Sequence, residues 1–152
     1  MHKTIKPTMP RRGHRLRARG DLTVKLWFNL LCKDIEAQKE FYRKLLGLVE
    51  ISESRTAIYR ALDGPHFQLG FNAHAAYTLL NLEPPAASVG ALRISSFPTF
   101  VLDEPLKVDA TYLTAVELGA TALKEPFDSH YGQRQMVLAD PEGNVLRLAA
   151  AA

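Results

Sequence analysis

The sequence predicts an α+β fold in which two βαβββ modules form a curved mixed-sheet cup. The order strand, helix and three strands occurs once in residues 24–73 and again in residues 97–150. With 152 residues and 47% hydrophobic composition, the chain is long enough for one well-buried domain, expected over 23–152, or for two small halves that share a core. Because a single four-stranded unit exposes one face of its sheet, two units must pair within a chain or between chains.

The first module begins with the apolar run LWFNLLC, which has the length of a strand and is soon followed by Asp34. Residues 35–46 have helical periodicity, and Gly47 is a natural end for that helix. Three more strands are expected at 48–54, 55–62 and 66–72, separated by Ser54 and by the turn-like DGPH.

The second module repeats this order with different spacing. A strand ends at Asp103, and a helix runs from residue 106 to Gly119. Strands follow at 120–125, 133–139 and 144–150. The linker between the modules, residues 74–96, contains two consecutive prolines and is the longest irregular stretch; a short strand is expected within it at 77–81.

A basic tail, residues 1–22, precedes the modules. Its first twenty residues hold seven lysines and arginines and no acidic residue, although the net charge of the whole chain is only +3. The rest of the chain has twelve basic against sixteen acidic residues, which gives −4. These twenty residues contain no aromatic side chain for base stacking and show no helical period. We therefore interpret the tail as a solvated extension and do not expect a nucleic-acid partner.

Composition also indicates where the protein works. No segment approaches the roughly 18 apolar residues of a membrane span, and Asp21, Lys25 and Asn29 interrupt the stretch that superficially resembles a signal core. The single cysteine, Cys32, cannot form an intrachain disulfide and fits a reducing compartment. We expect a cytoplasmic protein with no membrane partner.

The segment DPEGN, residues 140–144, has the composition of a turn and leads into the strand VLRLAA. Side chains of a strand alternate between its faces, so Leu146 and Leu148 share one face and Arg147 lies on the other. An arginine on a strand most often faces solvent. The alternative is that Arg147 faces a binding site.

Two segments resemble the vicinal oxygen chelate superfamily, which includes glyoxalase I, bleomycin resistance proteins, fosfomycin resistance enzymes and extradiol dioxygenases. The segment KDIEAQKEFYRKLLGL is similar to the family pattern D-x-x-x-S-x-x-FY-x-x-x-LG. The segment YGQRQMVLADPEGNVLRL is similar to the family ending G-x-R-x-x-x-x-x-DP-x-GN. The resemblance covers residues 24–150 and implies the glyoxalase/bleomycin resistance fold.

Metal-dependent members of that family carry a His or Glu on the first and last strand of each module, pointing into the cup. The divalent metal acts there as a Lewis acid on the substrate oxygens. The resemblance places Trp27, Gln68, Phe97 and Arg147 at the four positions. None of them is a competent ligand, because such metals need imidazole or carboxylate and Gln68 offers only a weak amide oxygen. We therefore expect no metal and no cofactor, with Arg147 facing the cup in place of a carboxylate.

The resemblance implies a small-molecule pocket with aromatic walls and a few fixed polar groups. Arg147 favours a carboxylate, a phosphate or an electron-rich planar ligand, and Tyr131 and Arg134 flank the mouth of the cup in the family pattern. The expected ligand-binding residues are Trp27, Gln68, Phe71, Phe97, Tyr131, Arg134 and Arg147.

Two main functions are compatible with these residues. The first is a metal-free protein that binds, and sequesters, an aromatic or anionic compound. The second is a lyase or dioxygenase-like enzyme with unusual metal ligands, or one that uses His130 or Tyr131 as acid or base. A third is an interaction module that acts through the basic tail. A homodimer is expected, because paired modules leave edge strands and apolar helix faces that a second copy covers.

Overall fold

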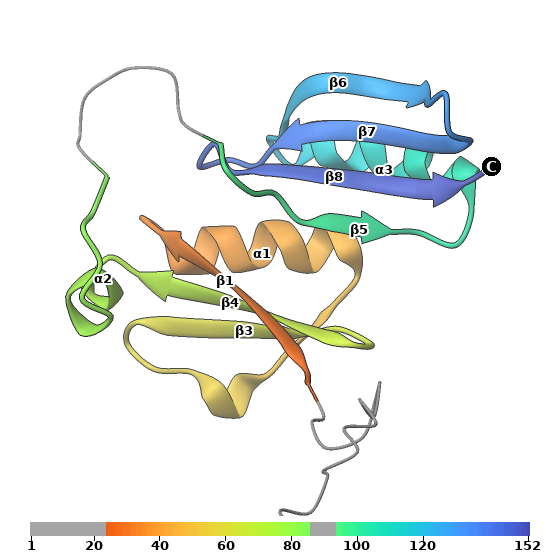
Figure 1. Cartoon of the computed structure of the whole chain (residues 1–152). Helices are drawn as coiled ribbons and strands as arrows, with labels where there is room; N and C mark the ends of the chain where they lie inside the picture. The colour runs from red at the N-terminus through yellow and green to blue at the C-terminus, as the bar shows by residue number, and fades with distance from the viewer. Residues whose placement is uncertain (1–23, 86–93) are drawn as a thin grey trace, which may run out of the picture.

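A computed structural model of the chain describes residues 24–85 and 94–152, so the tail 1–22 lies outside the described residues. The first module forms a four-stranded sheet, called sheet A here, in the order β1-β4-β3-β2, with β1 parallel to β4 (Figure 1). Its elements are β1 (Leu26–Cys32), α1 (Ile35–Leu46), β2 (Val49–Glu50), β3 (Tyr59–Asp63) and β4 (Phe67–Ala73).

The second module repeats this arrangement as sheet B, in the order β5-β8-β7-β6, with β5 parallel to β8. Its elements are β5 (Thr99–Val101), α3 (Pro105–Glu117), β6 (Thr121–Asp128), β7 (Gln133–Ala139) and β8 (Val145–Ala151). The predicted pair of βαβββ modules is confirmed. Among the described residues, none of the helices is long and apolar enough to span a membrane.

Two strand predictions are wrong. The expected strand at 77–81 is instead a short helix, α2 (Ala75–Leu79), which ends in a turn where Asn81 has a φ of 53°. The expected strand at 48–54 shortens to the two residues of β2, and a 3-10 turn, Ser52–Ser54, follows it. In that turn the Ser54 hydroxyl donates to the Ile51 carbonyl at 2.7 Å, a local bond that competes with strand pairing.

Local signals set both ends of α1. The Asp34 carboxylate accepts a hydrogen bond from the Ala37 amide at 2.9 Å, which caps the first turn. Gly47 has a φ of 64° and its amide donates to the Arg43 carbonyl, which closes the last turn. Within α1 the buried Gln38, Tyr42 and Leu45 follow one another at four and three residues, so they lie along one face of the helix.

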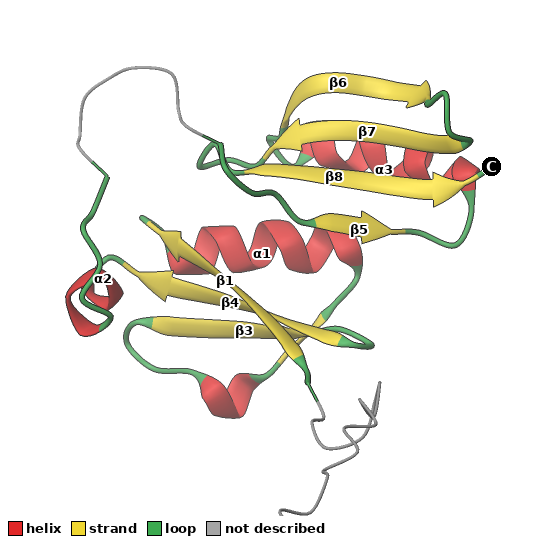
Figure 2. Ribbon diagram, viewed as in Figure 1, coloured by secondary structure: helices red, strands yellow, loops and turns green. Residues whose placement is uncertain are grey.

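One hydrophobic core serves both modules. Helix α1 lies between the two sheets, and α3 lies behind β7 and β8 in this view (Figure 2). Val108 and Ala115 of α3 belong to the same core cluster as Tyr42 of α1. The rings of Tyr42 and Phe71 from the first module are 5.7 Å apart, and Tyr42 is also 6.4 Å from Phe100 of the second. Leu146 and Leu148 of β8 are fully buried in the same core. The helix-covered faces of both sheets therefore turn inward.

The buried carboxylate of Asp140 joins the modules. It accepts hydrogen bonds from Gln38 Nε2 at 2.9 Å and from the Tyr42 hydroxyl at 2.7 Å, both on α1. It also accepts from the amides of Glu142 and Asn144 in its own turn, at 2.9 and 3.0 Å. A buried carboxylate is stable only when such donors surround it. The DPEGN turn is therefore fixed against α1, and we call this set of contacts the Asp140 clamp.

A second contact from the same turn holds the start of α1. The Glu142 carboxylate accepts from the backbone amides of Lys33 and Asp34, at 2.6 and 3.1 Å. Nearby Cys32 is buried, and burial, followed by the charges of Glu142 and Asp140, raises the pKa of its thiol to about 12. The thiol therefore stays protonated and packs as a small hydrophobic group.

Replacing Tyr42 by phenylalanine removes the hydroxyl that donates to Asp140. We expect Tyr42→Phe to lower the free energy of unfolding by about 1.5–3 kcal/mol at neutral pH, the range for a hydrogen bond to a charged group. Burial, followed by the charge of Asp140, raises the pKa of Tyr42. The Tyr42 contribution is thus fully present below about pH 10, the ordinary tyrosine pKa, and declines above it as the unfolded chain loses its proton.

Urea unfolding at about pH 7 and about pH 11 measures this difference. The gap between wild type and Tyr42→Phe should shrink at the higher pH, because phenylalanine has no proton to lose. Tyr131→Phe is the matched control: Tyr131 is 55% exposed, so its variant should change stability little at either pH. A Tyr42→Phe gap that stays constant or widens with pH contradicts this assignment.

Candidate functional site

Strand alternation gives each sheet one covered face and one open face. In sheet A, Phe28 of β1 and Leu69 of β4 pack toward the core. Trp27 and Gln68, one position away on the same strands, therefore lie on the opposite face. They are also direct neighbours, because β1 and β4 pair in a register that sets Trp27 beside Gln68.

The open face of sheet A is aromatic and polar. Trp27 is 57% exposed, although tryptophan is usually well buried. Gln68 is buried beside it, and its Nε2 donates to the Tyr59 hydroxyl on β3 at 3.0 Å. Tyr59 was not predicted from the sequence, because its place next to Gln68 depends on the pairing of β3 with β4.

The open face of sheet B holds Arg147. Its Nε donates to the Thr99 hydroxyl on the neighbouring strand at 3.0 Å, and its guanidinium lies 5.3 Å from the centre of the Phe97 ring. Thr99 and Arg147 are register partners of β5 and β8. Within residues 24–85 and 94–152, no acidic side chain forms an ion pair with Arg147, which leaves both terminal nitrogens of the guanidinium available to a ligand.

Tyr131 lies at the edge of the same face. Its hydroxyl accepts a hydrogen bond from Gln135 Nε2 at 2.6 Å. Gln135 pairs with Ala149 in the β7–β8 register, two residues beyond Arg147, so these side chains share one face of sheet B. Gln135 was not predicted from the sequence either, although it directly precedes the core residue Met136 and so lies on the open face of β7.

Two of the expected site residues lie elsewhere. Phe71 is fully buried against Tyr42, on the covered face of β4, because it is three positions from Gln68. Arg134 points toward α3, where its Nη2 lies 2.7 Å from Asp109 Oδ1. This ion pair lowers the pKa of Asp109, and together with a weaker contact to Asp128 it raises the pKa of Arg134. Phe71 thus belongs to the core, and Arg134 forms an ion pair that joins α3 to β7.

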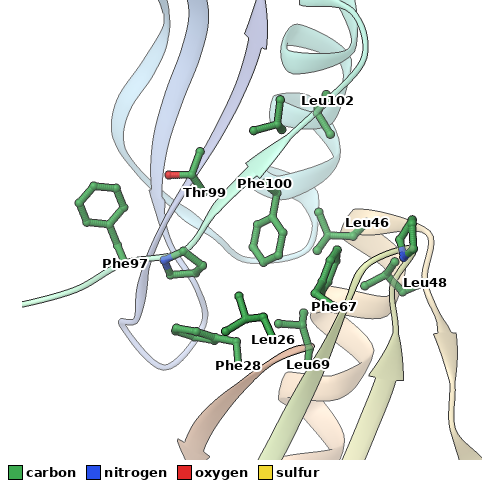
Figure 3. Close-up of a pocket in the computed structure, with 13 residues that line it drawn as sticks. Leu26, Phe28, Leu46, Leu48, Phe67, Leu69, Phe97, Thr99, Phe100 and Leu102 are labelled. Carbon is green, nitrogen blue, oxygen red and sulfur yellow. The ribbon is translucent and has the colours of Figure 1, made fainter. Parts of the chain in front are cut away.

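A cavity of about 600 Å³ opens at the seam between the modules (Figure 3). It lies on the covered side of sheet A, and none of its thirteen lining residues is ionisable. Phe67 and Phe100 both line it, and their rings pack against each other with centres 5.8 Å apart. Its lining includes Phe97 but neither Trp27, Gln68 nor Arg147. In a single chain the two open faces therefore do not share this cavity.

The residues at the four family metal positions do not fit a divalent metal. Trp27 and Phe97 have no lone pair to donate, Arg147 is a cation, and Gln68 offers only an amide oxygen. Across the described parts of the chain, no group of three or more His, Cys, Asp or Glu side chains could hold a metal ion. The open faces instead offer a guanidinium, amides, hydroxyls and aromatic rings.

Comparison with known proteins supports the fold. A family model described as "Glyoxalase/Bleomycin resistance protein/Dioxygenase superfamily" matches residues 26–148. A glyoxalase/bleomycin resistance protein/dioxygenase family enzyme from Burkholderia phytofirmans PsJN is 36% identical, with a TM-score of 0.76, and the match covers 83% of this chain and 97% of that one. Comparison with curated proteins gave no match.

More distant structures share the fold alone. A glyoxalase-related enzyme from Fulvimarina pelagi is 18% identical with a TM-score of 0.70, and the match covers 85% of this chain and 88% of that one. A lactoylglutathione lyase from Agrobacterium tumefaciens is 16% identical with a TM-score of 0.63, and the match covers 86% and 96%. The repeated module, the match over residues 26–148 and the relative at 36% identity lead to one conclusion. The chain belongs to the glyoxalase/bleomycin resistance protein/dioxygenase superfamily.

Proposed function

We propose that this protein is a homodimer that binds an aromatic or anionic small molecule without a catalytic metal. The observation that carries the proposal is the environment of Arg147. Its guanidinium lies on an open sheet face beside an aromatic ring, and among the residues that the structure describes only its Nε is engaged, by Thr99. The two terminal nitrogens can bind a carboxylate or phosphate through two parallel hydrogen bonds. Phe97 adds a surface on which a planar ligand can stack.

A second copy of the chain supplies the opposite wall of the site. β1 is the last strand of sheet A and β5 is the last strand of sheet B, so each has one edge that no strand of the described residues pairs with. Both edges carry exposed apolar side chains: Leu26 and Trp27 on β1, and Val101 on β5. Such edges need a partner. Pairing β1 with β5 of the second copy, twice around a two-fold axis, satisfies both edges at once.

This pairing makes one curved eight-stranded sheet from sheet A of one copy and sheet B of the other. With both helices on the outside, Trp27 and Gln68 face Arg147 across the concave side. Each dimer then has two identical sites, and each site takes residues from both copies. The aromatic walls and fixed polar groups are those of a typical small-molecule pocket.

The dimer can be tested at its edges. Light scattering should give a mass about twice the 16.9 kDa of the chain. Val101→Asp puts a charge on the β5 edge and should shift the protein toward monomer, because a buried unpaired charge is strongly unfavourable. Val49→Asp is the matched control, since Val49 is 73% exposed on β2 and Val101 is 72% exposed. A wild-type monomer, or equal effects of the two variants, contradicts the proposed interface.

The role of Arg147 can be tested with benzoate and phenyl phosphate. Both should raise the melting temperature of the wild type by binding the native state. Arg147→Ala should weaken their binding by about 1.5–3 kcal/mol, the range for hydrogen bonds to a charged group. Arg134→Ala removes an arginine from the covered face of the same sheet, so it should leave their affinity unchanged. Equal affinities of wild type and Arg147→Ala would place Arg147 outside the site.

The enzyme alternative makes a different prediction about metals. The Burkholderia phytofirmans relative is described as an enzyme, and a lyase or dioxygenase reaction of this family relies on a divalent metal. The residue types at the four positions predict no tight site here. After chelator treatment, titration of the full chain with Zn²⁺, Ni²⁺ and Mn²⁺ should show no stoichiometric tight binding. Saturation at one equivalent with submicromolar affinity would favour the metalloenzyme.

A further inference from the structure

The open face of sheet A carries two hydrogen-bonded pairs of polar side chains around Gly70. In one pair, Asn72 Nδ2 donates to Asn29 Oδ1 at 3.1 Å. In the other, Gln68 Nε2 donates to the Tyr59 hydroxyl at 3.0 Å. Asn29 pairs with Gly70 in the β1–β4 register. Two short polar contacts from three different strands therefore meet on one side of the sheet.

Gly70 is what allows the two pairs to form. A Cβ atom at this position would lie 2.2 Å from Asn29 Oδ1 and 2.9 Å from the Tyr59 hydroxyl. The Asn29 side chain lies over Gly70 in this space and contacts Asn72, two residues further along β4. Any larger residue at position 70 must displace both Asn29 and Tyr59. The arrangement of these polar groups therefore requires glycine at this position.

Each pair leaves one donor and one acceptor unused. Asn29 Nδ2 and Asn72 Oδ1 remain from the first pair, and the Tyr59 hydroxyl proton and Gln68 Oε1 remain from the second. Within residues 24–85 and 94–152, none of these four groups has a hydrogen-bond partner. A neutral group with an N–H next to a carbonyl, such as a primary carboxamide or a lactam, can satisfy a donor and an acceptor together.

The same face disfavours an anion. Asn72 Oδ1 and Gln68 Oε1 both present lone pairs, which repel a carboxylate. Asp63 of β3 pairs with Gln68 in the sheet register and adds a negative charge on the open face. Trp27, in register with Gln68 on the other side, provides a flat surface for an aromatic ring. This half of the site therefore differs in charge from the half that contains Arg147.

We propose that Asn29 and Asn72, assisted by Gln68 and Tyr59, bind the carboxamide or lactam edge of a planar aromatic ligand that stacks on Trp27. The inference rests on the proposed function, because it assigns the other half of the same site. The ligand is then an aromatic compound with a neutral amide edge. If the ligand also carries an anionic group, that group points toward Arg147 of the second copy.

Trp27 is the only tryptophan in the chain, so its fluorescence reports on this face without a label. The full-length chain is titrated with benzamide and, separately, with benzoate. Both should change the Trp27 emission in a saturable way, and benzamide should also shift the side-chain amide NMR signals of Asn29 and Asn72. The bifunctional 4-carbamoylbenzoate should bind more tightly than either, because it offers a group to each half.

Two variants probe the amide edge. Asn72→Leu removes the Asn72 acceptor and the hydrogen bond that holds Asn29. It should weaken benzamide binding about tenfold, which corresponds to the loss of one to two neutral hydrogen bonds. Benzoate binding should not change. Gly70→Ala displaces Asn29 and Tyr59 without changing their chemistry, and should have the same effect. Circular dichroism and urea unfolding show whether each variant is folded. Should Asn72→Leu fail to fold, Asn29→Asp keeps the side-chain shape and replaces the free donor by an acceptor.

Arg147→Ala separates this inference from the proposed function. It should weaken benzoate and leave benzamide unchanged, the reverse of Asn72→Leu. Benzamide affinity that is unchanged in Asn72→Leu, Gly70→Ala and Asn29→Asp overturns the inference, while benzoate binding through Arg147 still stands. Benzoate binding that is independent of Arg147, with benzamide binding lost in the asparagine variants, overturns only the anion-binding half. No saturable response of Trp27 to any of the three compounds overturns both.

Discussion

The buried carboxylate of Asp140 determines how the two modules are arranged. It joins Gln38 and Tyr42 of α1 to the turn between β7 and β8. A carboxylate in a protein interior is strongly destabilising when its donors are removed, so α1 has to stay against that turn. Since α1 also packs on sheet A, its position turns the covered faces of both sheets toward a common core. The faces with Trp27 and Arg147 are left outside as a direct result.

These open faces differ in chemistry. Sheet A offers neutral donors and acceptors beside an indole ring, whereas sheet B offers a guanidinium beside a phenyl ring. Neither face alone encloses a ligand. In the proposed dimer, ligand recognition and subunit association depend on the same strands, β1 and β5. A molecule that contacts both walls must therefore stabilise the dimer, and dilution must weaken its binding.

Local sequence patterns predicted the features that local physics controls. The Gly47 end of α1, the DPEGN turn and the order of strands and helix within each module all follow from residues close in the chain. The cap at Asp34 was not predicted. The prediction at 77–81 was wrong because an apolar run fits either a strand or a short helix. Phe71 was assigned to the site although it lies an odd number of residues from Gln68. The contact of Asn29 with Asn72 spans 43 residues and depends on strand register, which no local pattern encodes.

The clamp at Asp140 has a consequence for how the chain folds as it is made. Gln38 and Tyr42 are separated from Asp140 by 102 and 98 residues. A ribosome therefore releases all of the first module, and most of the second, before the acceptor for these two side chains exists. Until then the side of α1 that faces the second module lacks the surface that it contacts in the finished protein. Such a transient species is prone to aggregate, and its lifetime is set by the rate of translation.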